Sequence, residues 1–145
     1  MKKKALFLCT GNSARSQMAE GLVNHDFAGT IEAYSAGTDP QGLNAYAVKV
    51  MAELDIDIRG NTSKHISKYE GQNFDYVITL CDDANENCPV FFGGVKRLHM
   101  GFPDPAKATG SDEDILVEFR RIRDKIRARM NGFFESELTT ESRGR

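Results

Sequence analysis

The sequence of 145 residues is poor in the residue types that mark several large protein classes. It has no tryptophan, only 4 prolines and 13 glycines, so a collagen-like or low-complexity chain is excluded. Its 3 cysteines, Cys9, Cys81 and Cys88, are too few and too odd in number for the disulfide framework of a small secreted protein. In a reducing compartment, such cysteines are buried core residues, metal ligands or catalysts.

Neither charge nor hydropathy points to a nucleic acid or a membrane. The 21 acidic and 19 basic residues give a net charge of −2, whereas a dedicated nucleic-acid binder is usually basic. The longest apolar run near the N-terminus, residues 5–9, is far shorter than the roughly 20 residues of a membrane-spanning helix. It is also too short for the apolar region of a signal peptide, although three lysines precede it. We therefore expect a cytoplasmic protein that binds neither nucleic acid nor membrane.

Short apolar runs alternate with helical patterns along the chain. Strands are predicted at residues 4–9, 31–36, 75–81 and 95–100. Helices are predicted at residues 15–27 and 45–54, where apolar residues recur at helical spacing. Residues 37–42 and 101–110, which hold glycine and proline, are predicted to be loops. The alternation of strands and helices indicates an α/β fold with a parallel sheet.

A long helix is predicted to close the chain. Ser111 and Asp114 resemble a capping box, and apolar residues then recur three or four positions apart as far as Phe133. The opposite face carries five arginines with acidic residues between them, which is typical of a solvated face rather than of a phosphate-binding surface. We expect one domain over residues 1–134, followed by a polar, frayed tail over residues 135–145.

The topology of α/β folds places three reactive side chains together. Ligands of such folds bind outside the carboxyl ends of the strands. Cys9 ends the first predicted strand, Cys81 ends the third, and Asp104 lies in the loop after the fourth. All three are therefore predicted at one edge of the sheet.

The loop that opens the first helix has the composition of an oxyanion site. A loop of small residues turns its backbone N–H groups inward, and the positive end of the following helix points to the same place. Arg15 adds a planar fork of donors that fits a tetrahedral oxyanion. A thiol in this field favours its thiolate, and Ser16 can donate a hydrogen bond to it. We expect the oxyanion to be bound by Thr10, Gly11, Asn12, Ser13, Ala14, Arg15 and Ser16.

The pattern Cys-x5-Arg-Ser thus predicts that Cys9 attacks a bound oxyanion. The alternative, a small buried core cysteine, does not explain the Gly, Asn, Arg and Ser that follow it. A nucleotide-binding P-loop is a poor alternative, because its Gly-x4-Gly-Lys-Ser/Thr pattern is absent. Asp104 lies in the stiff turn Gly-Phe-Pro-Asp-Pro and is the natural acid partner, although aspartate before proline is also a common turn residue.

The remaining two cysteines are seven positions apart in a polar segment. In one helix their Cα atoms would lie about 10.5 Å apart. A disulfide needs roughly 4.4–6.8 Å, so a bond between Cys81 and Cys88 requires that segment to unwind. Cys9 and Cys81, by contrast, end strands that could be neighbours, about 4.8 Å apart. Two alternatives stay open: purely structural thiols, or a metal site with His65 or His99, which no close Cys-x2-Cys spacing supports.

These motifs together resemble the thioredoxin-coupled arsenate reductases, a family with the low-molecular-weight tyrosine phosphatase fold. The resemblance rests on residues 9–20, 34–37, 79–89 and 101–105, and it covers residues 4–134. It implies a single three-layer domain in which a four-stranded parallel sheet has helices on both faces and a phosphatase-type anion loop after its first strand. It also implies arsenate as the substrate, with phosphate or sulfate as mimics, and thioredoxin as the reductant. We expect no bound cofactor or metal, and a monomer.

The resemblance further implies a relay of thiols. Cys9 would attack arsenate held by the loop and Arg15, while Asp104 protonates a leaving oxygen. Cys81 would then attack Cys9 and release arsenite, and Cys88 would take over the disulfide, which thioredoxin reduces. This fits the cysteine count, because reducing As(V) to As(III) takes two thiols and a third is useful for handing the disulfide to a partner.

Two positions depart from some relatives. Ala14 stands where some of them have a further cysteine, although alanine is common in the reductases. Others hold a potassium ion with residues that match Asn12, Glu20 and Ser35 plus an acidic residue, and the last position is here Lys64. The ammonium group of Lys64 could therefore take the place of the cation.

Two other functions stay open. A phosphatase for phosphotyrosine or phosphoarginine would use the same loop, with water in place of Cys81. Gln17, where phosphatases of this fold usually have proline, favours the reductase, as does the absence of a tyrosine pair after Pro105. Because phosphate and arsenate are nearly isosteric, we expect weak phosphatase activity as a side reaction. The third possibility is a redox sensor whose segment between Cys81 and Cys88 unfolds on oxidation.

Overall fold

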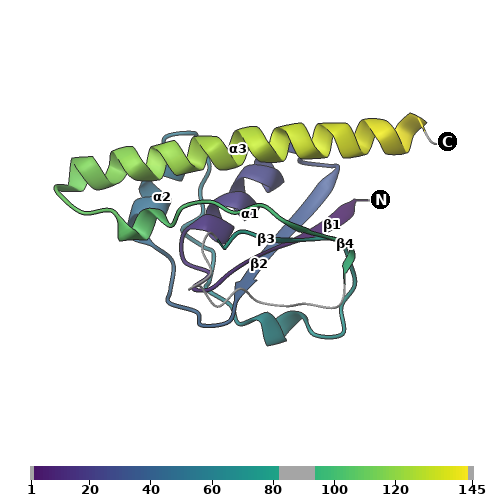
Figure 1. Cartoon of the computed structure of the whole chain (residues 1–145), viewed down its shortest axis with the longest axis horizontal. Coiled ribbons are helices and arrows are strands. Elements are labelled where there is room, and N and C mark those ends of the chain that lie inside the picture. Colours follow the sequence, from purple (N-terminus) through teal and green to yellow (C-terminus); the bar gives the residue numbers. More distant parts are fainter. Residues whose placement is uncertain (1, 82–93, 144–145) are drawn as a thin grey trace.

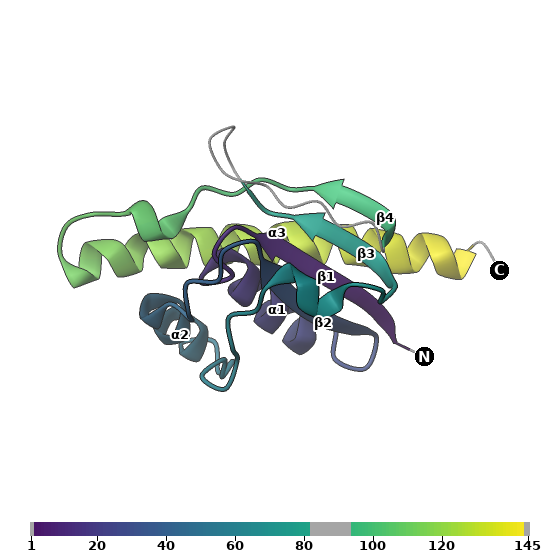
Figure 2. The same ribbon diagram turned by 90° about the horizontal axis from the view of Figure 1, so that it is seen from below.

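The computed structural model describes residues 2–81 and 94–143 and contains a four-stranded parallel sheet (Figures 1 and 2). The strands lie side by side in the order β2-β1-β3-β4, with β1 hydrogen-bonded to both β2 and β3. This confirms the predicted α/β fold and the neighbouring positions of the first and third strands. The strand bounds are β1 Lys3–Cys9, β2 Ile31–Gly37, β3 Phe74–Thr79 and β4 Gly94–His99.

The two faces of the sheet are covered differently because successive side chains of a strand point to opposite faces. In β1, Ala5 and Phe7 join the core that also holds the buried side chains of the three α-helices. Leu6 and Leu8 join a second, smaller core together with Tyr69. Tyr69 belongs to the short 3-10 helix η1, so the sheet lies between two layers. The helix bounds are α1 Arg15–Asp26, α2 Ala45–Ala52, α3 Asp112–Arg143, η1 Ile66–Tyr69 and η2 Pro105–Lys107.

Helix α3 runs along the whole length of the molecule (Figure 1). It begins with the predicted capping box: Ser111 Oγ accepts from the N–H of Asp114 at 3.1 Å, and Asp114 Oδ2 accepts from the N–H of Ser111 at 3.1 Å. The prediction that the helix ends near Phe134 is wrong, because it continues to Arg143. Leu138, four residues after Phe134, packs against the main core and extends the apolar stripe. Glu137 also forms an ion pair with Lys96 of β4 at 2.6 Å.

Four of the five arginines on this face of α3 pair with carboxylates: Arg120, Arg121, Arg123 and Arg127. Arg120 pairs with both Glu53 and Glu113 at 2.9 Å, and Arg127 makes two bonds to Asp26 at 2.7 and 2.8 Å. These pairs fix α3 to α1 and to the end of α2. The charge pattern therefore serves packing and solvation, as expected, rather than phosphate binding.

The remaining differences from the sequence-based elements are small. Helix α2 ends at Ala52 instead of residue 54, and the predicted loop over residues 101–110 contains η2. Among residues 2–81 and 94–143, no helix is both long and apolar enough to cross a membrane. The polar segment after Cys81, and Cys88 within it, lie outside the described residues.

Candidate active site

The loop between β1 and α1 has its carbonyl groups fixed from outside. Residues 39–44, which follow β2, donate backbone N–H groups to the oxygens of Thr10 and Gly11 at 2.9 Å and of Ser13 at 3.1 Å. Ser63 Oγ donates to the carbonyl oxygens of Gly11 and Asn12, at 3.0 and 2.9 Å. Because a trans peptide is planar, its N–H points away from its C=O, and no described peptide is cis. The N–H groups of residues 11–14 are therefore turned inward, which is the arrangement of an anion-binding nest.

Close approach of β2 to this loop requires a glycine. A Cβ atom on Gly37 would lie 2.4 Å from the carbonyl oxygen of Thr10 and 2.7 Å from that of Cys9. Both contacts are with backbone atoms, which cannot move aside without displacing the loop. The last residue of the motif Tyr-Ser-Ala-Gly is thus explained by packing against the anion loop.

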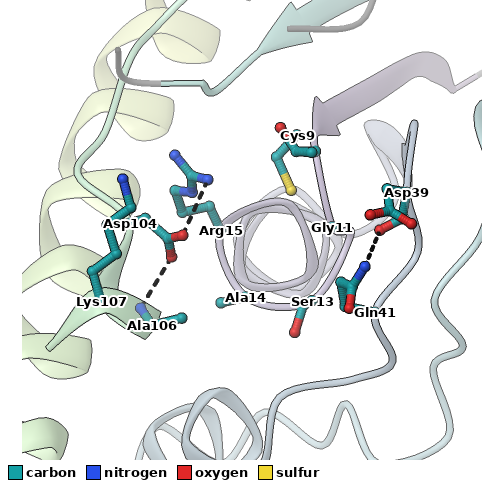
Figure 3. A pocket seen from close by; sticks show the side chains of 11 residues that line it. Cys9, Gly11, Ser13, Ala14, Arg15, Asp39, Gln41, Asp104, Ala106 and Lys107 are labelled. Carbon is teal, nitrogen blue, oxygen red and sulfur yellow. Dashed lines mark hydrogen bonds and ion pairs between the residues drawn. The ribbon is translucent and has the colours of Figure 1, made fainter. Parts of the chain in front are cut away.

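Cys9 and Ser16 form the buried floor of the site. Cys9 ends β1, and its side chain lies at the N-terminal end of α1 (Figure 3). The thiol Sγ is 2.9 Å from Ser16 Oγ, and the two residues are 2% and 0% exposed. The positive end of a helix stabilises negative charge placed there. The position of Cys9 thus fits a nucleophilic thiolate.

Arg15, the first residue of α1, is held by two backbone carbonyl groups. Its Nη1 donates to the carbonyl oxygens of Phe102 at 3.1 Å and Leu80 at 3.5 Å. Arg15 is only 4% exposed. These two carbonyls belong to the segments that follow β4 and β3. The guanidinium is thus oriented by backbone groups, which leaves its planar fork in a fixed direction at the cavity.

Asp104 lies beside Arg15, on the same side of Cys9 (Figure 3). Its Oδ1 accepts from the N–H of Ala106 at 3.0 Å and caps η2, while Oδ2 lies 3.7 Å from Arg15 Nη2. The side chain is 25% exposed, so a proton can exchange with water. The structure thus brings Asp104 to the same edge of the sheet as Cys9, as the topology predicted.

The cavity between these groups has a volume of about 450 Å³. Asp104 and Lys107 stand on one side of Cys9, and Asp39 and Gln41 stand on the other (Figure 3). No aromatic side chain is among the described residues that line it. The lining consists of Cys9, Thr10, Gly11, Ser13, Ala14, Arg15, Asp39, Gln41, Asp104, Ala106 and Lys107.

Cys81 lies two residues beyond the end of β3, beside β1. The N–H of Leu80 donates to the carbonyl oxygen of Leu8 at 2.8 Å, so the β1–β3 ladder continues to the residue before Cys81. Cys81 is 2% exposed, as is Cys9. Two buried cysteines therefore lie at the carboxyl ends of adjacent strands, and Cys9 lines the cavity. Cys88 cannot be placed, since it is outside the described residues.

A buried carboxylate and a lysine lie behind the loop. Lys64 Nζ is 4.0 Å from Glu20 Oε1, which also accepts from Ser35 Oγ at 3.1 Å. Burial raises the pKa of Glu20, although Lys64 and Ser35 act in the opposite direction. Burial likewise lowers the pKa of Lys64, with Glu20 opposing it. Lys64 thus lies beside the carboxylate, which is the position that the hypothesis of a lysine in place of a cation requires.

The two histidines considered as metal ligands are engaged in local hydrogen bonds. His65 Nδ1 accepts from the N–H of Ser67 at 3.0 Å, and His99 Nδ1 lies 2.8 Å from Thr79 Oγ1. Within residues 2–81 and 94–143, no three His, Cys, Asp or Glu side chains are grouped as metal ligands would be.

Several site residues escaped the sequence-based prediction. Asp39, Gln41 and Lys107 line the cavity, and Ser63 supports the loop from a distant segment. The first two directly follow β2, so the rule that ligands bind at carboxyl ends of strands could have found them. No local pattern marks Ser63, because its role depends on backbone contacts between segments about fifty residues apart.

Comparison with known proteins agrees with this geometry. The model of the family Low molecular weight phosphotyrosine protein phosphatase matches residues 4–143. The chain is 50% identical over 135 residues to an arsenate reductase of Shouchella clausii (strain KSM-K16), covering 93% of this chain and 97% of that protein. It is 48% identical over 130 residues to an arsenate reductase of Bacillus subtilis (strain 168), covering 90% and 94%.

A solved structure is similar over nearly the same length. An arsenate reductase in its phosphate-binding state superimposes with a TM-score of 0.78 at 31% identity, covering 92% of this chain and 98% of that chain.

Proposed function

The chain belongs to the low molecular weight phosphotyrosine protein phosphatase family, and from this premise we propose that it is an arsenate reductase that works through a relay of three thiols. The observation that supports this best is the pair of buried cysteines, Cys9 and Cys81, which lie at the carboxyl ends of the adjacent strands β1 and β3. A phosphatase needs the first thiol alone, whereas a two-electron reduction needs both. The two relatives named above, from Shouchella clausii and Bacillus subtilis, are arsenate reductases as well.

In the first step, the nest and Arg15 bind arsenate as they would bind phosphate. The Cys9 thiolate attacks arsenic, an S–As bond forms, and an As–O bond breaks. Asp104, 3.7 Å from Arg15, supplies the proton with which the departing oxygen leaves as water. Arsenic is still As(V) at this stage, and Cys9 carries it as a thioester-like adduct.

In the second step, Cys81 attacks the sulfur of Cys9. An S–S bond forms, and the electron pair of the S–As bond goes to arsenic, which leaves as arsenite. Cys88 then attacks Cys81, frees the Cys9 thiolate and leaves a disulfide between Cys81 and Cys88. The dithiol of thioredoxin reduces this disulfide, so that each cycle converts arsenate and reduced thioredoxin into arsenite, oxidised thioredoxin and water.

Hydrolysis of phosphate esters is the second candidate function. The same loop, Arg15 and Asp104 suit it, and the matching family is defined by phosphatases. However, the relatives named above, which cover at least 90% of the chain, are arsenate reductases. We therefore propose phosphatase activity only as a weak side reaction. A redox sensor would not turn over at all, so turnover separates it from both enzymes.

The test is a coupled assay with arsenate, thioredoxin, thioredoxin reductase and NADPH, run beside p-nitrophenyl phosphate hydrolysis on the same sample. We expect sustained, arsenate-dependent NADPH consumption and far slower ester hydrolysis. The variant Cys88→Ser should release about one arsenite per protein molecule and then stop, because its disulfide cannot reach thioredoxin. Normal steady-state turnover by Cys88→Ser would contradict the relay.

A further inference from the structure

Gln17, in the first turn of α1, is a fully buried amide that does not line the cavity. Its Nε2 lies 3.2 Å from the carbonyl oxygen of Asn12, 3.1 Å from Asn12 Oδ1 and 3.0 Å from the carbonyl oxygen of Thr62. Its Oε1 accepts from Asn61 Nδ2 at 3.3 Å. Burying an amide lowers stability unless its hydrogen bonds are made. An apolar residue at this position would pack without needing any of these partners.

The neighbours of Gln17 fix which way its amide and that of Asn12 face. Backbone carbonyl oxygens only accept, so the atom of Gln17 beside them must be the nitrogen. The N–H of Lys64 only donates, and it lies 2.8 Å from the Asn12 side chain, so that atom must be Oδ1. The Asn12 nitrogen is then left facing Ser16 Oγ, at 2.8 Å. Two donors, the N–H of Lys64 and Nε2 of Gln17, thus hold Asn12 Oδ1, and turning either amide over would break these hydrogen bonds.

This direction determines what the Ser16 hydroxyl can do. Asn12 Nδ2 donates to Ser16 Oγ, so the single hydroxyl hydrogen must go to another acceptor. Among the described residues, the remaining hydrogen-bond partner of Ser16 Oγ is Cys9 Sγ, at 2.9 Å. Ser16 is therefore the donor of that bond. A donor on sulfur stabilises the thiolate and disfavours the thiol.

Gln17 also supports the unusual backbone of the loop. Asn12 has a φ of 45°, in the left-handed region that residues other than glycine seldom adopt. Gln17 Nε2 bonds to both the backbone and the side-chain oxygen of that residue. Removing the amide would leave the N–H of Lys64 as the donor that orients the Asn12 side chain. Asn12 Nδ2 would then be held less firmly in its direction toward Ser16 Oγ.

We propose that Gln17 is a positioning residue that acts through Asn12 and Ser16 to keep a hydrogen-bond donor on Cys9. The proposal rests on the proposed function only in taking Cys9 as the nucleophile. The chain of contacts runs in one direction, from the Gln17 amide to Asn12, from Asn12 to Ser16 and from Ser16 to the sulfur.

The experiment uses protein in which Cys81→Ser and Cys88→Ser leave Cys9 as the sole thiol of the sequence. The readout is the rate of alkylation by iodoacetamide at pH 7, divided by the limiting rate at high pH, which reports the thiolate fraction at neutral pH. Ser16→Ala should lower this ratio about tenfold, and Gln17→Met should lower it about threefold or more. The double variant should be no lower than Ser16→Ala alone, because Gln17 acts through Ser16.

A matched control lies on the same helix. The side chain of Asn24 bonds to the backbone N–H and C=O of Ala33, at 2.8 and 3.1 Å. Asn24→Ala thus also removes an amide bonded to backbone, and it should leave the alkylation ratio unchanged. Should Gln17→Met fail to fold, Gln17→Asn keeps a polar amide but is too short for the contacts with Asn12, and the same lowered ratio is expected.

Two results would overturn the proposal. One is an unchanged ratio in Gln17→Met or Gln17→Asn when Ser16→Ala lowers it. The other is a double variant whose loss equals the product of the single losses, since Gln17 would then act independently of Ser16. Arsenate turnover is not part of this readout. A protein without arsenate turnover but with the expected ratios would therefore refute the proposed function and leave the role of Gln17 standing.

Discussion

The first turns of α1 and α3 solve the same problem in opposite ways. Every helix begins with backbone N–H groups that have no partner inside the helix. Helix α3 closes its own N-terminus with the Ser111–Asp114 capping box and with three acidic residues in its first turn. Helix α1 begins after Ala14, which makes no side-chain cap, and has no acidic residue in its first turn. Its positive end is therefore left for Cys9 and for an external anion.

The comparison separates two uses of the same physical feature. At α3, the side chains supply the negative charge and the result is stability. At α1, no side chain of the first turn supplies that charge. The nest, Arg15 and the positive helix end can therefore bind a ligand. The stability that α1 forgoes at its N-terminus is supplied elsewhere, through buried contacts such as Met18 and Leu22 in the main core.

The strongest way to break this contrast is to cap α1 as α3 is capped. Ala14→Asp places a carboxylate in the cavity lining. Two like charges about 4 Å apart repel by about 4 kcal/mol at an effective dielectric constant of about 20. We expect the affinity for phosphate and arsenate, measured by calorimetry, to fall at least a hundredfold, on the order of the repulsion. Ala14→Asn is the neutral control and should keep most of the affinity. Equal losses of affinity in both variants would show that the size of the side chain at position 14, and not its charge, determines anion binding.

The far end of α1 offers an intermediate effect with a pH dependence. Burial alone would raise the pKa of Asp26, but its hydrogen bonds from Arg127 and His25 outweigh burial and lower the pKa from its ordinary value of 3.8. A carboxylate with a lowered pKa stabilises the fold above its unfolded-state value, and the contribution is lost as the pH falls through its folded-state value.

Arg127→Gln should therefore lower the free energy of unfolding by about 1–2 kcal/mol at pH 7, because it removes a bidentate pair that is only partly exposed. The difference from the unchanged protein should shrink below about pH 4, close to the unfolded-state value of aspartate. Urea unfolding of both proteins at pH 7 and at pH 3 measures this difference. A difference that is the same at pH 7 and pH 3 would mean that Arg127 acts by packing alone.

The smallest expected effect lies at the capped helix. Ser111→Ala removes the acceptor of the Asp114 N–H and should lower the free energy of unfolding by about 1 kcal/mol. Arsenate turnover per folded molecule should not change, because Ser111 does not line the cavity. Ser111→Asp, which keeps a capping oxygen, should restore most of the stability. A loss of turnover in Ser111→Ala would show that α3 is coupled to the site.

The sequence was sufficient to predict the four strands and the position of the loop from Cys9 to Ser16, because both depend on consecutive residues. The strands are short apolar runs, and the loop from Cys9 to Ser16 carries its chemistry in consecutive residues. The topology rule then predicted Asp104 and Cys81 at the same edge. In the structure Asp104 lies 3.7 Å from Arg15, and Cys81 directly follows Leu80, whose carbonyl oxygen Arg15 contacts.

What the sequence did not yield depends on contacts between distant segments. The continuation of α3 to Arg143 is marked by a single apolar residue, Leu138, in an otherwise polar stretch. The carbonyl contacts of the anion loop come from residues 39–44 and from Ser63, and backbone donors leave no residue pattern. The buried role of Gln17 was hidden for the same reason, since its partners are oxygens of the loop and of Thr62.

The central claim is that Cys81 completes a reduction that Cys9 begins, and single-turnover arsenite release tests it most directly. Prereduced protein is mixed with arsenate without thioredoxin, and arsenite is quantified beside p-nitrophenyl phosphate hydrolysis. We predict about one arsenite per molecule for the unchanged chain. For Cys81→Ser we predict no arsenite, with ester hydrolysis retained. Arsenite release by Cys81→Ser at the normal yield would contradict the account.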